Sequence, residues 1–137
     1  MEAVRRRHNT SAILRSCESF GIHEVHLVTG DFVPAAGAAR GAERWVNLRS
    51  FTRVEDSLGE LKARGFRILV ADFIQPSWSP DAAPLDRPIA VVFGSEVRGV
   101  SEAARSFADG AITIPMHGLT TSLNVSVSAA IILHRLS

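Results

Sequence analysis

The sequence predicts an α/β domain with a mostly parallel sheet and helices on both faces, formed by all 137 residues. Segments with apolar residues at helical spacing alternate with short apolar runs, as in chains where each strand is followed by a helix. Some of these runs are continuously apolar, which is typical of parallel strands buried on both faces. No internal repeat or low-complexity tract divides the chain, so we expect one domain spanning residues 1–137.

The first half of the chain is expected to start with a helix. Asn9 is a good N-cap, apolar residues follow at helical spacing, and Gly21 ends the pattern. The further elements expected here are a strand Glu24–Val28, a short helical turn within Pro34–Gly41, a strand Trp45–Leu48 and an amphipathic helix Val54–Arg64 that ends at Gly65.

The second half alternates more clearly between strands and helices. Its expected elements are a strand Phe66–Phe73, a proline-rich loop Gln75–Arg87, a strand Ile89–Phe93, a helix Ser101–Phe107 capped by Ser101, a strand Ala111–Ile114 and a final helix Ser122–Leu136. Ligands of such sheets bind beyond the carboxyl ends of the strands. Two loops, 93–101 and 114–124, occupy that position. They offer many backbone hydrogen-bonding groups and few charges, which suits a nucleoside better than a bare triphosphate.

Several classes of protein are poorly supported by this sequence. It has no G-x-G-x-x-G after the first strand, no P-loop, no nucleophile elbow and no H-E-x-x-H. No apolar run is long enough for a membrane helix, and no secretory signal is visible. Cys17 is the only cysteine and is expected to be buried, which agrees with a reducing cytoplasm. His23 and His26 point to opposite faces of a strand, so we expect no metal site.

The net charge is only +1, but the positive charges are unevenly distributed. Arg5, Arg6, Arg7 and His8 form one block, and Arg15 follows in the first helix. Arginine suits phosphate groups, so this block is a candidate RNA-binding surface. Codon bias in a GC-rich genome is an alternative reason for the preference of arginine over lysine, but it does not explain the clustering.

Three segments together resemble the SpoU/TrmH branch of the SPOUT methyltransferases. They are Asn9-Thr10-Ser11-Ala12-Ile13-Leu14-Arg15, Phe93-Gly94-Ser95-Glu96 with Gly99 and Ser101-Glu102, and Ile114-Pro115-Met116-His117-Gly118 with Ser122-Leu123-Asn124-Val125-Ser126-Val127. The stretch Gly41–Leu48 also looks like the tRNA guanosine-18 enzymes of this family.

The resemblance implies a fold and an activity that periodicity does not show. It implies a deep trefoil knot at the C-terminal end, S-adenosyl-L-methionine (SAM) bound in the knot loops, no metal, and a homodimer with its active site at the subunit interface. The implied reaction is methylation of a ribose 2′-hydroxyl in structured RNA. Transfer RNA, at a D-loop guanosine, is the first expected substrate, ribosomal RNA is the second, and the expected location is the cytoplasm.

The resemblance also implies roles for individual residues. The implied catalytic residues are Arg15, Asn9, Glu96, Ser122 and Asn124, and the implied cofactor-binding positions are Gly94, Ile114, Met116 and Leu123. Some of these have simpler explanations: Asn9 is also a plausible helix cap, Glu96 an exposed bystander, and Ser122 and Asn124 are plausible partners for free amides at a helix start. His117 is expected at the rim of the pocket.

Two departures leave other interpretations open. Ser11 stands where the family often has glycine, and the chain is expected to lack the extra helices that its nearest relatives have at both ends. A SAM- or RNA-binding module with little activity is therefore one alternative. A flavodoxin-like nucleotide-binding domain without a knot is another; bound SAM in the C-terminal loops would exclude it.

Overall fold

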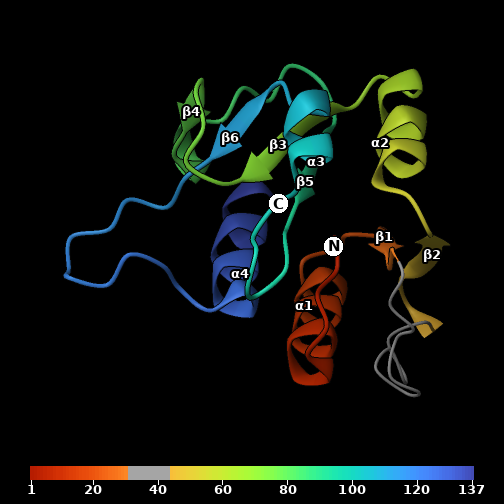
Figure 1. Cartoon of the computed structure of the whole chain (residues 1–137), viewed down its shortest axis with the longest axis horizontal. Helices are drawn as coiled ribbons and strands as arrows, with labels where there is room; N and C mark the ends of the chain where they lie inside the picture. The colour runs from red at the N-terminus through yellow and green to blue at the C-terminus, as the bar shows by residue number, and fades with distance from the viewer. Residues whose placement is uncertain (31–43) are drawn as a thin grey trace.

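The computed structural model describes residues 1–30 and 44–137. In chain order its elements are α1 (Arg7–Ser19), β1 (Glu24–Val28), β2 (Asn47–Phe51), α2 (Val54–Ala63), β3 (Arg67–Ala71), β4 (Ser77–Trp78), the 3-10 helix η2 (Pro80–Ala82), β5 (Ile89–Val92), α3 (Glu102–Phe107), β6 (Gly110–Ile112) and α4 (Val125–Leu136). The predicted α/β class is confirmed (Figure 1).

The strands form two parallel sheets rather than the one sheet that we expected. β1 pairs with β2, and the other strands form a sheet in the order β4-β6-β3-β5. β1 and β5 are not paired with each other along their lengths. Within residues 1–30 and 44–137, the first residues of the chain connect them: Glu2 forms a bridge to Val28, and the amide of Glu2 donates to the carbonyl of Phe93 at 2.8 Å.

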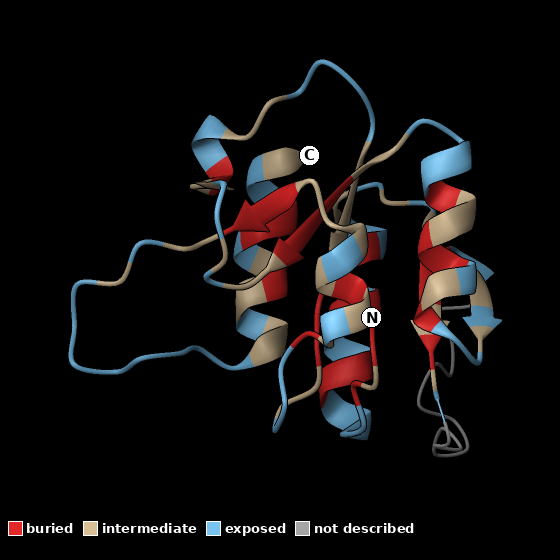
Figure 2. Ribbon diagram, turned by 45° about the horizontal axis from the view of Figure 1, so that its top comes forward, coloured by how far each residue is buried: buried red, intermediate tan, exposed pale blue. Residues whose placement is uncertain are grey.

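Helices cover both faces of the larger sheet. α1 packs against α4, and α2 packs against α3 (Figure 1). Side chains of a strand alternate between faces. Leu69 of β3 therefore belongs to the core cluster that includes α1 and α4, whereas its neighbours Ile68 and Val70 belong to the cluster that includes α2 and α3. Figure 2 shows this buried layer between the helices.

The first helix begins earlier than the sequence suggested. Its N-cap is Arg6 and it starts at Arg7, so the prediction of Asn9 as the cap is wrong. Asn9 is the third residue of the helix and is only 1% exposed. At α3 the prediction is confirmed, because the hydroxyl of Ser101 accepts a hydrogen bond from the amide of Ala104 at 3.1 Å.

Other boundaries differ by a few residues. β2 starts two residues after the expected Trp45, and the predicted loop Gln75–Arg87 contains β4 and η2. These two residues of strand pair with β6, a long-range contact that the proline-rich local sequence does not show. The last helix starts at Val125, with Asn124 as its N-cap, so Ser122 lies before it. The expected turn within Pro34–Gly41 lies outside the described residues.

Cys17 agrees with a simpler expectation. Cys17 is buried, and burial raises the pKa of its thiol to about 11. Within residues 1–30 and 44–137, no helix has both the length and the apolar character needed to cross a membrane.

Candidate functional site

A cavity of about 550 Å³ opens at the carboxyl ends of three neighbouring strands. Residues that directly follow β3, β5 and β6 form much of its wall, and the start of α4 closes one side. The connection 113–124 forms another wall and extends away from the body of the domain (Figures 1 and 2). Both loops that the sequence singled out therefore meet at one cavity.

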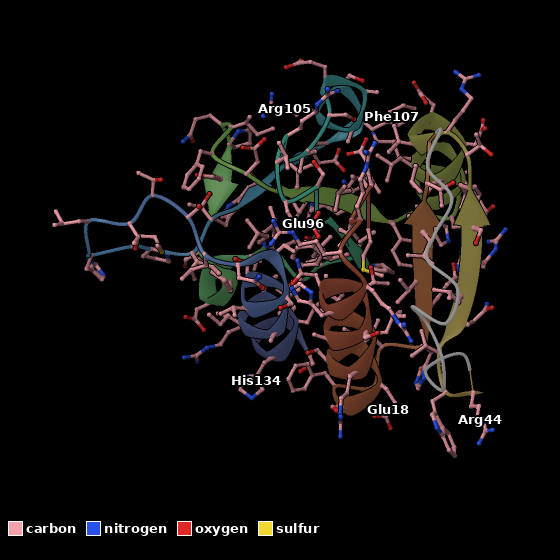
Figure 3. The ribbon with its side chains drawn as sticks, turned by 60° about the horizontal axis from the view of Figure 1, so that its bottom comes forward. Glu18, Arg44, Glu96, Arg105, Phe107 and His134 are labelled. Atoms are coloured by element: carbon pink, nitrogen blue, oxygen red, sulfur yellow. The ribbon has the colours of Figure 1, made fainter. Side chains whose placement is uncertain are left out.

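Glu96 joins the loop after β5 to the start of α1. Its carboxylate accepts hydrogen bonds from the backbone amides of Arg5 at 3.2 Å and Arg6 at 3.1 Å. It also accepts one from Nδ2 of Asn9 at 3.0 Å. α1 has no side-chain cap at Arg6, and a negative charge is favourable at a helix N-terminus. Glu96 thus takes the place of a local cap, although it lies 90 positions after the N-cap residue Arg6. In Figure 3 it lies near the ends of α1 and α4.

Asn9 connects this carboxylate to the last helix. Its Oδ1 accepts a hydrogen bond from Nδ2 of Asn124 at 3.1 Å. Oδ1 of Asn124 in turn accepts from the amides of Ser126 at 2.9 Å and Val127 at 3.3 Å. The chain Glu96–Asn9–Asn124 therefore joins α1, the loop after β5 and the start of α4, the three segments in which the sequence motifs occur.

The same contacts decide the charge of Glu96. Burial acts to raise the pKa of its carboxyl group, but the hydrogen bonds from Asn9 and from backbone amides outweigh that effect and hold the pKa below 4.5. The carboxylate is therefore an anion and a hydrogen-bond acceptor at neutral pH. This arrangement suits a residue that positions the cavity walls rather than one that delivers a proton.

The four expected cofactor positions all line the cavity: Gly94, Ile114, Met116 and Leu123. At Gly94 the need for glycine is steric, because a Cβ there would lie 2.1 Å from the backbone carbon of Gly99. The loop folds back tightly at this point, and Ser95 and Gly99 exchange backbone hydrogen bonds of 3.1 and 3.0 Å. Leu123 is 39% exposed at the open side.

Of the two remaining expected catalytic residues, one lines the cavity and the other does not. Ser122 lines the cavity together with Asn9, Glu96 and Asn124. Arg15 does not: it lies on the exposed face of α1, and the described partners of Glu96 do not include it. His117 is exposed and is absent from the described lining as well.

The basic block lies beside the cavity. All of its residues are exposed: Arg5, Arg6, Arg7 and His8. The backbone amides of Arg5 and Arg6 are the ones that donate to the carboxylate of Glu96. Arg6 also contributes to the cavity wall. The block thus contributes one residue, Arg6, to the wall of a mostly uncharged cavity, and its other residues are exposed neighbours of Arg6 in the chain.

Sequence reasoning missed the contribution of the residues that follow β3. Asp72 and Phe73, which follow β3, line the cavity, as does Thr113, which follows β6. Thr113 Oγ1 donates to the carbonyl of Asp72 at 2.8 Å, and the Asp72 carboxylate pairs with Nε of Arg105 at 2.7 Å. The signal was available, since β3 has a buried apolar centre and its carboxyl end lies at the same edge of the sheet as that of β5.

A second polar cluster lies away from this cavity, between β1 of the smaller sheet and α2. One ligand atom each from Glu24, His26 and Glu60 lies within 4.8 Å of the others. Arginines already pair with these carboxylates: Arg64 with Glu24 at 2.6 Å, and Arg49 with Glu60. The hydrogen bond from Arg64 is the main cause of a lowered pKa at Glu24. The cluster is therefore charge-compensated, and we infer no metal from it.

Comparison with known proteins identifies the family. The model of the SpoU rRNA Methylase family matches residues 1–134. The tRNA (guanosine(18)-2'-O)-methyltransferase of Thermus thermophilus is 42% identical over 135 residues, which are 97% of this chain and 70% of that protein.

Solved structures agree with the sequence comparison. The TrmH/SpoU tRNA modifying enzyme of Aquifex aeolicus has a TM-score of 0.85 and 32% identity, and the match covers 98% of this chain and 70% of that one. The SpoU methyltransferase AviRb of Streptomyces viridochromogenes, solved in complex with AdoMet, shares the fold with a TM-score of 0.85 at 20% identity, over 98% of this chain and 56% of that one. The chain belongs to the SpoU rRNA Methylase family.

Proposed function

We propose that this chain transfers a methyl group from SAM to a ribose 2′-hydroxyl in structured RNA, most specifically in tRNA at a D-loop guanosine. The observation that carries the proposal is the cavity at the ends of β3, β5 and β6, in which the motif residues Glu96, Asn9 and Asn124 form one hydrogen-bonded chain. Similarity to a tRNA guanosine methyltransferase supports tRNA as the substrate. The family description supports ribosomal RNA as the second candidate.

The residues around the cavity fit SAM. The cavity volume of about 550 Å³ falls in the usual range for small-molecule sites. Gly94, Ile114 and Met116 offer backbone polar groups and apolar surface of the kind that holds an adenosine. SAM would supply a methyl group on a sulfonium, which is already a good electrophile. The chain's own residues then have to bind the ribose, hold its hydroxyl in line and help its proton to leave.

Arg15 is the proposed residue for the hydroxyl and the adjacent phosphate. A guanidinium is a hydrogen-bond donor and a poor base, so we assign Arg15 to orienting and polarising the hydroxyl. Because Arg15 is exposed on α1 and outside the described cavity lining, we propose that it acts at the cavity of a second subunit. Ser122 is the proposed partner for the substrate at the cavity wall.

The proposed assembly is a homodimer. Val127 and Ile131 of α4 are 46% and 37% exposed, and Leu123 before the helix is 39% exposed. The opposite face of α4 buries Ala129, Ile132 and Leu133 in the core. An apolar helix face left at the surface favours contact with a partner. If the partner is a copy of this chain, it would also supply its Arg15 to the cavity of the first subunit.

We further propose that the chain is a single SpoU/TrmH-type catalytic domain, that its C-terminal segment forms the trefoil knot of this family, and that it acts in the cytoplasm. The basic surface of Arg5, Arg6, Arg7 and His8 would hold the RNA backbone at the mouth of the cavity.

The testing experiment measures methyl transfer directly. Purified protein is incubated with methyl-labelled SAM and either tRNA or ribosomal RNA, and the modified nucleoside is identified by mass spectrometry. We expect a 2′-O-methylated guanosine in tRNA. Binding of SAM and RNA without transfer would support the alternative, a binding module with little activity, and absence of SAM binding would reject both.

A further inference from the structure

The loop between β5 and α3 holds two of its residues outside the cavity that its other residues line. Ser95, Glu96 and Gly99 belong to the cavity wall, whereas Val97 and Arg98, which lie between them, are outside the described lining. Both of these residues are exposed, and Val97 is 89% exposed. Arg98 is thus available to a group that lies just outside the cavity.

The tip of this loop is held in one conformation by its own hydrogen bonds. The amide of Arg98 donates to the hydroxyl of Ser95 at 2.9 Å. Ser95 and Gly99 exchange two backbone hydrogen bonds, and Gly99 has a φ of 67°, which glycine adopts without strain. The residues on either side, Phe93 and Val100, are buried. Because a pre-formed loop loses little freedom on binding, the backbone of Arg98 is prepared for a ligand.

The carboxylates next to this loop are bound to other groups. The carboxylate of Glu96 accepts hydrogen bonds from two backbone amides and an asparagine side chain. The carboxylate of Glu2 accepts from the amide of Ser101 at 3.1 Å. Glu102 pairs with Arg105 at 2.8 Å. In the described part of the chain, none of these carboxylates forms an ion pair with the arginine at the loop tip.

Arginines without a carboxylate partner are concentrated near the cavity. Within residues 1–30 and 44–137, carboxylates pair with Arg49, Arg53, Arg64, Arg67, Arg87, Arg105 and Arg135. They form no such pair with Arg6 and Arg7 at the start of α1, with Arg15 further along it, or with Arg98. Arg44 also has no described carboxylate partner, but Figure 3 shows it at the edge of the molecule, away from Glu96. The uncompensated charge near the cavity favours an anionic partner there.

Glu96 brings Arg6 and Arg98 onto one surface. Its carboxylate binds the amide of Arg6 at 3.1 Å, and Arg98 follows Glu96 by two residues. Guanidinium groups bind phosphate through paired N–H donors. Because the positive charges continue from the loop along the start of α1, they match a chain of phosphates better than a single anion.

We propose that Arg98 binds a phosphate of the RNA backbone just outside the cavity, next to a phosphate held by Arg6. The inference rests on the RNA substrate proposed above. The loop then has two roles: Glu96 fixes the cavity wall, and Arg98 holds the RNA chain whose ribose enters the cavity. Phosphate contacts position a nucleic acid without reading its sequence, so Arg98 contributes to the affinity for RNA and not to the choice of nucleotide.

The test measures RNA binding by filter retention between about 50 and 200 mM salt, with unmodified tRNA as the probe. We expect Arg98→Gln to weaken binding by about five- to tenfold. The slope of the logarithm of affinity against the logarithm of salt concentration should fall by about one, because one phosphate contact is lost. Arg98→Lys keeps the charge and should keep the slope. Neither change should alter the melting temperature, since the side chain is exposed.

Arg44→Gln is the matched control, because Arg44 is also an exposed arginine without a described carboxylate partner. Equal weakening by Arg98→Gln and Arg44→Gln would show a general effect of net charge and overturn the inference. Unchanged affinity and slope in Arg98→Gln would overturn it as well. A weaker homodimer in light scattering, with RNA binding unchanged, would assign Arg98 to a carboxylate of a second copy and also reject the proposal.

The same measurements separate this inference from the proposed activity. If Arg98→Gln has the expected effect and the unsubstituted chain transfers no methyl group, the phosphate contact stands and the activity is rejected. Methyl transfer by the unsubstituted chain, with unchanged RNA binding in Arg98→Gln, rejects the phosphate contact alone. Absence of RNA binding by the unsubstituted chain overturns both.

Discussion

Asn9 of α1 accepts a hydrogen bond from Asn124 at the start of α4, with 3.1 Å between Oδ1 and Nδ2, although the two residues are 115 positions apart. Asn9 also donates to Glu96. One buried amide side chain therefore fixes two segments that form the cavity wall. Its satisfied hydrogen bonds explain why a polar side chain with 1% exposure is tolerated here.

Substitution of Asn124 separates its two structural roles. Asn124→Ala removes both the cap of α4 and the bond to Asn9, and should lower the free energy of unfolding by about 2 kcal/mol. Asn124→Ser keeps an oxygen for the cap but has no amide to donate to Asn9. We expect it to lose less stability, yet to weaken SAM binding as alanine does. Urea unfolding and calorimetry with SAM measure the two effects; equal SAM affinity in Asn124→Ser and the unsubstituted chain would contradict the second role.

The charge of Glu96 should appear in the pH dependence of stability. Its pKa is lower in the folded chain than its ordinary value of 4.5, so its contribution is fully present above pH 4.5 and is lost as the pH falls through the folded value. Glu96→Gln should lower the free energy of unfolding by about 1 kcal/mol at pH 7, because charge-assisted bonds become neutral ones. The difference between the two proteins should shrink below pH 4.5. A difference that stays constant from pH 7 to pH 3 in urea unfolding would argue against this role of the charge.

Two glycines near the cavity offer a matched pair. Gly94→Ala would place a Cβ 2.1 Å from the backbone carbon of Gly99, whereas a Cβ on Gly118 would meet nothing within 4 Å. We expect Gly94→Ala to reduce stability by about 1–3 kcal/mol and to weaken SAM binding, since backbone must move. Gly118→Ala should change the stability little. Thermal unfolding with and without SAM tests both, and a harmless Gly94→Ala would show that the loop between Ser95 and Gly99 rearranges easily.

Arg15 is predicted to act in the reaction without supporting the fold. Its side chain is exposed, so Arg15→Ala should leave the melting temperature within about a degree or two, as is usual for surface substitutions. Methyl transfer to tRNA should fall by a factor of about 100 or more, with SAM affinity unchanged. Arg53→Ala, at another exposed arginine away from the cavity, is the control. Full activity of Arg15→Ala in a single-turnover assay would remove Arg15 from the mechanism.

The local sequence was a sound guide where short-range physics decides the structure. Ser101 follows an apolar strand and precedes a helical pattern, and it caps α3 as expected. Gly94, Ile114, Met116 and Leu123 lie in loops at the carboxyl ends of strands, and parallel topology brings such ends to one edge. Periodicity also predicted α2 closely, because its buried residues Val54, Leu58 and Leu61 recur at helical spacing.

The sequence by itself determined the α/β class, most of the elements and the two loops at the carboxyl ends of strands, since these depend on hydrophobic periodicity, capping and strand direction. The individual residues predicted for the cavity came from the resemblance to the SpoU/TrmH family. Only the tertiary structure decided the role of Asn9, because its partners Glu96 and Asn124 are 87 and 115 positions away and no local pattern encodes such contacts. The tertiary structure also decided that Arg15 lies outside the described lining of its own chain's cavity, and that β1 and β5 remain apart. Helix orientation and strand pairing depend on packing across the whole domain, and a single segment of sequence contains no information about that packing.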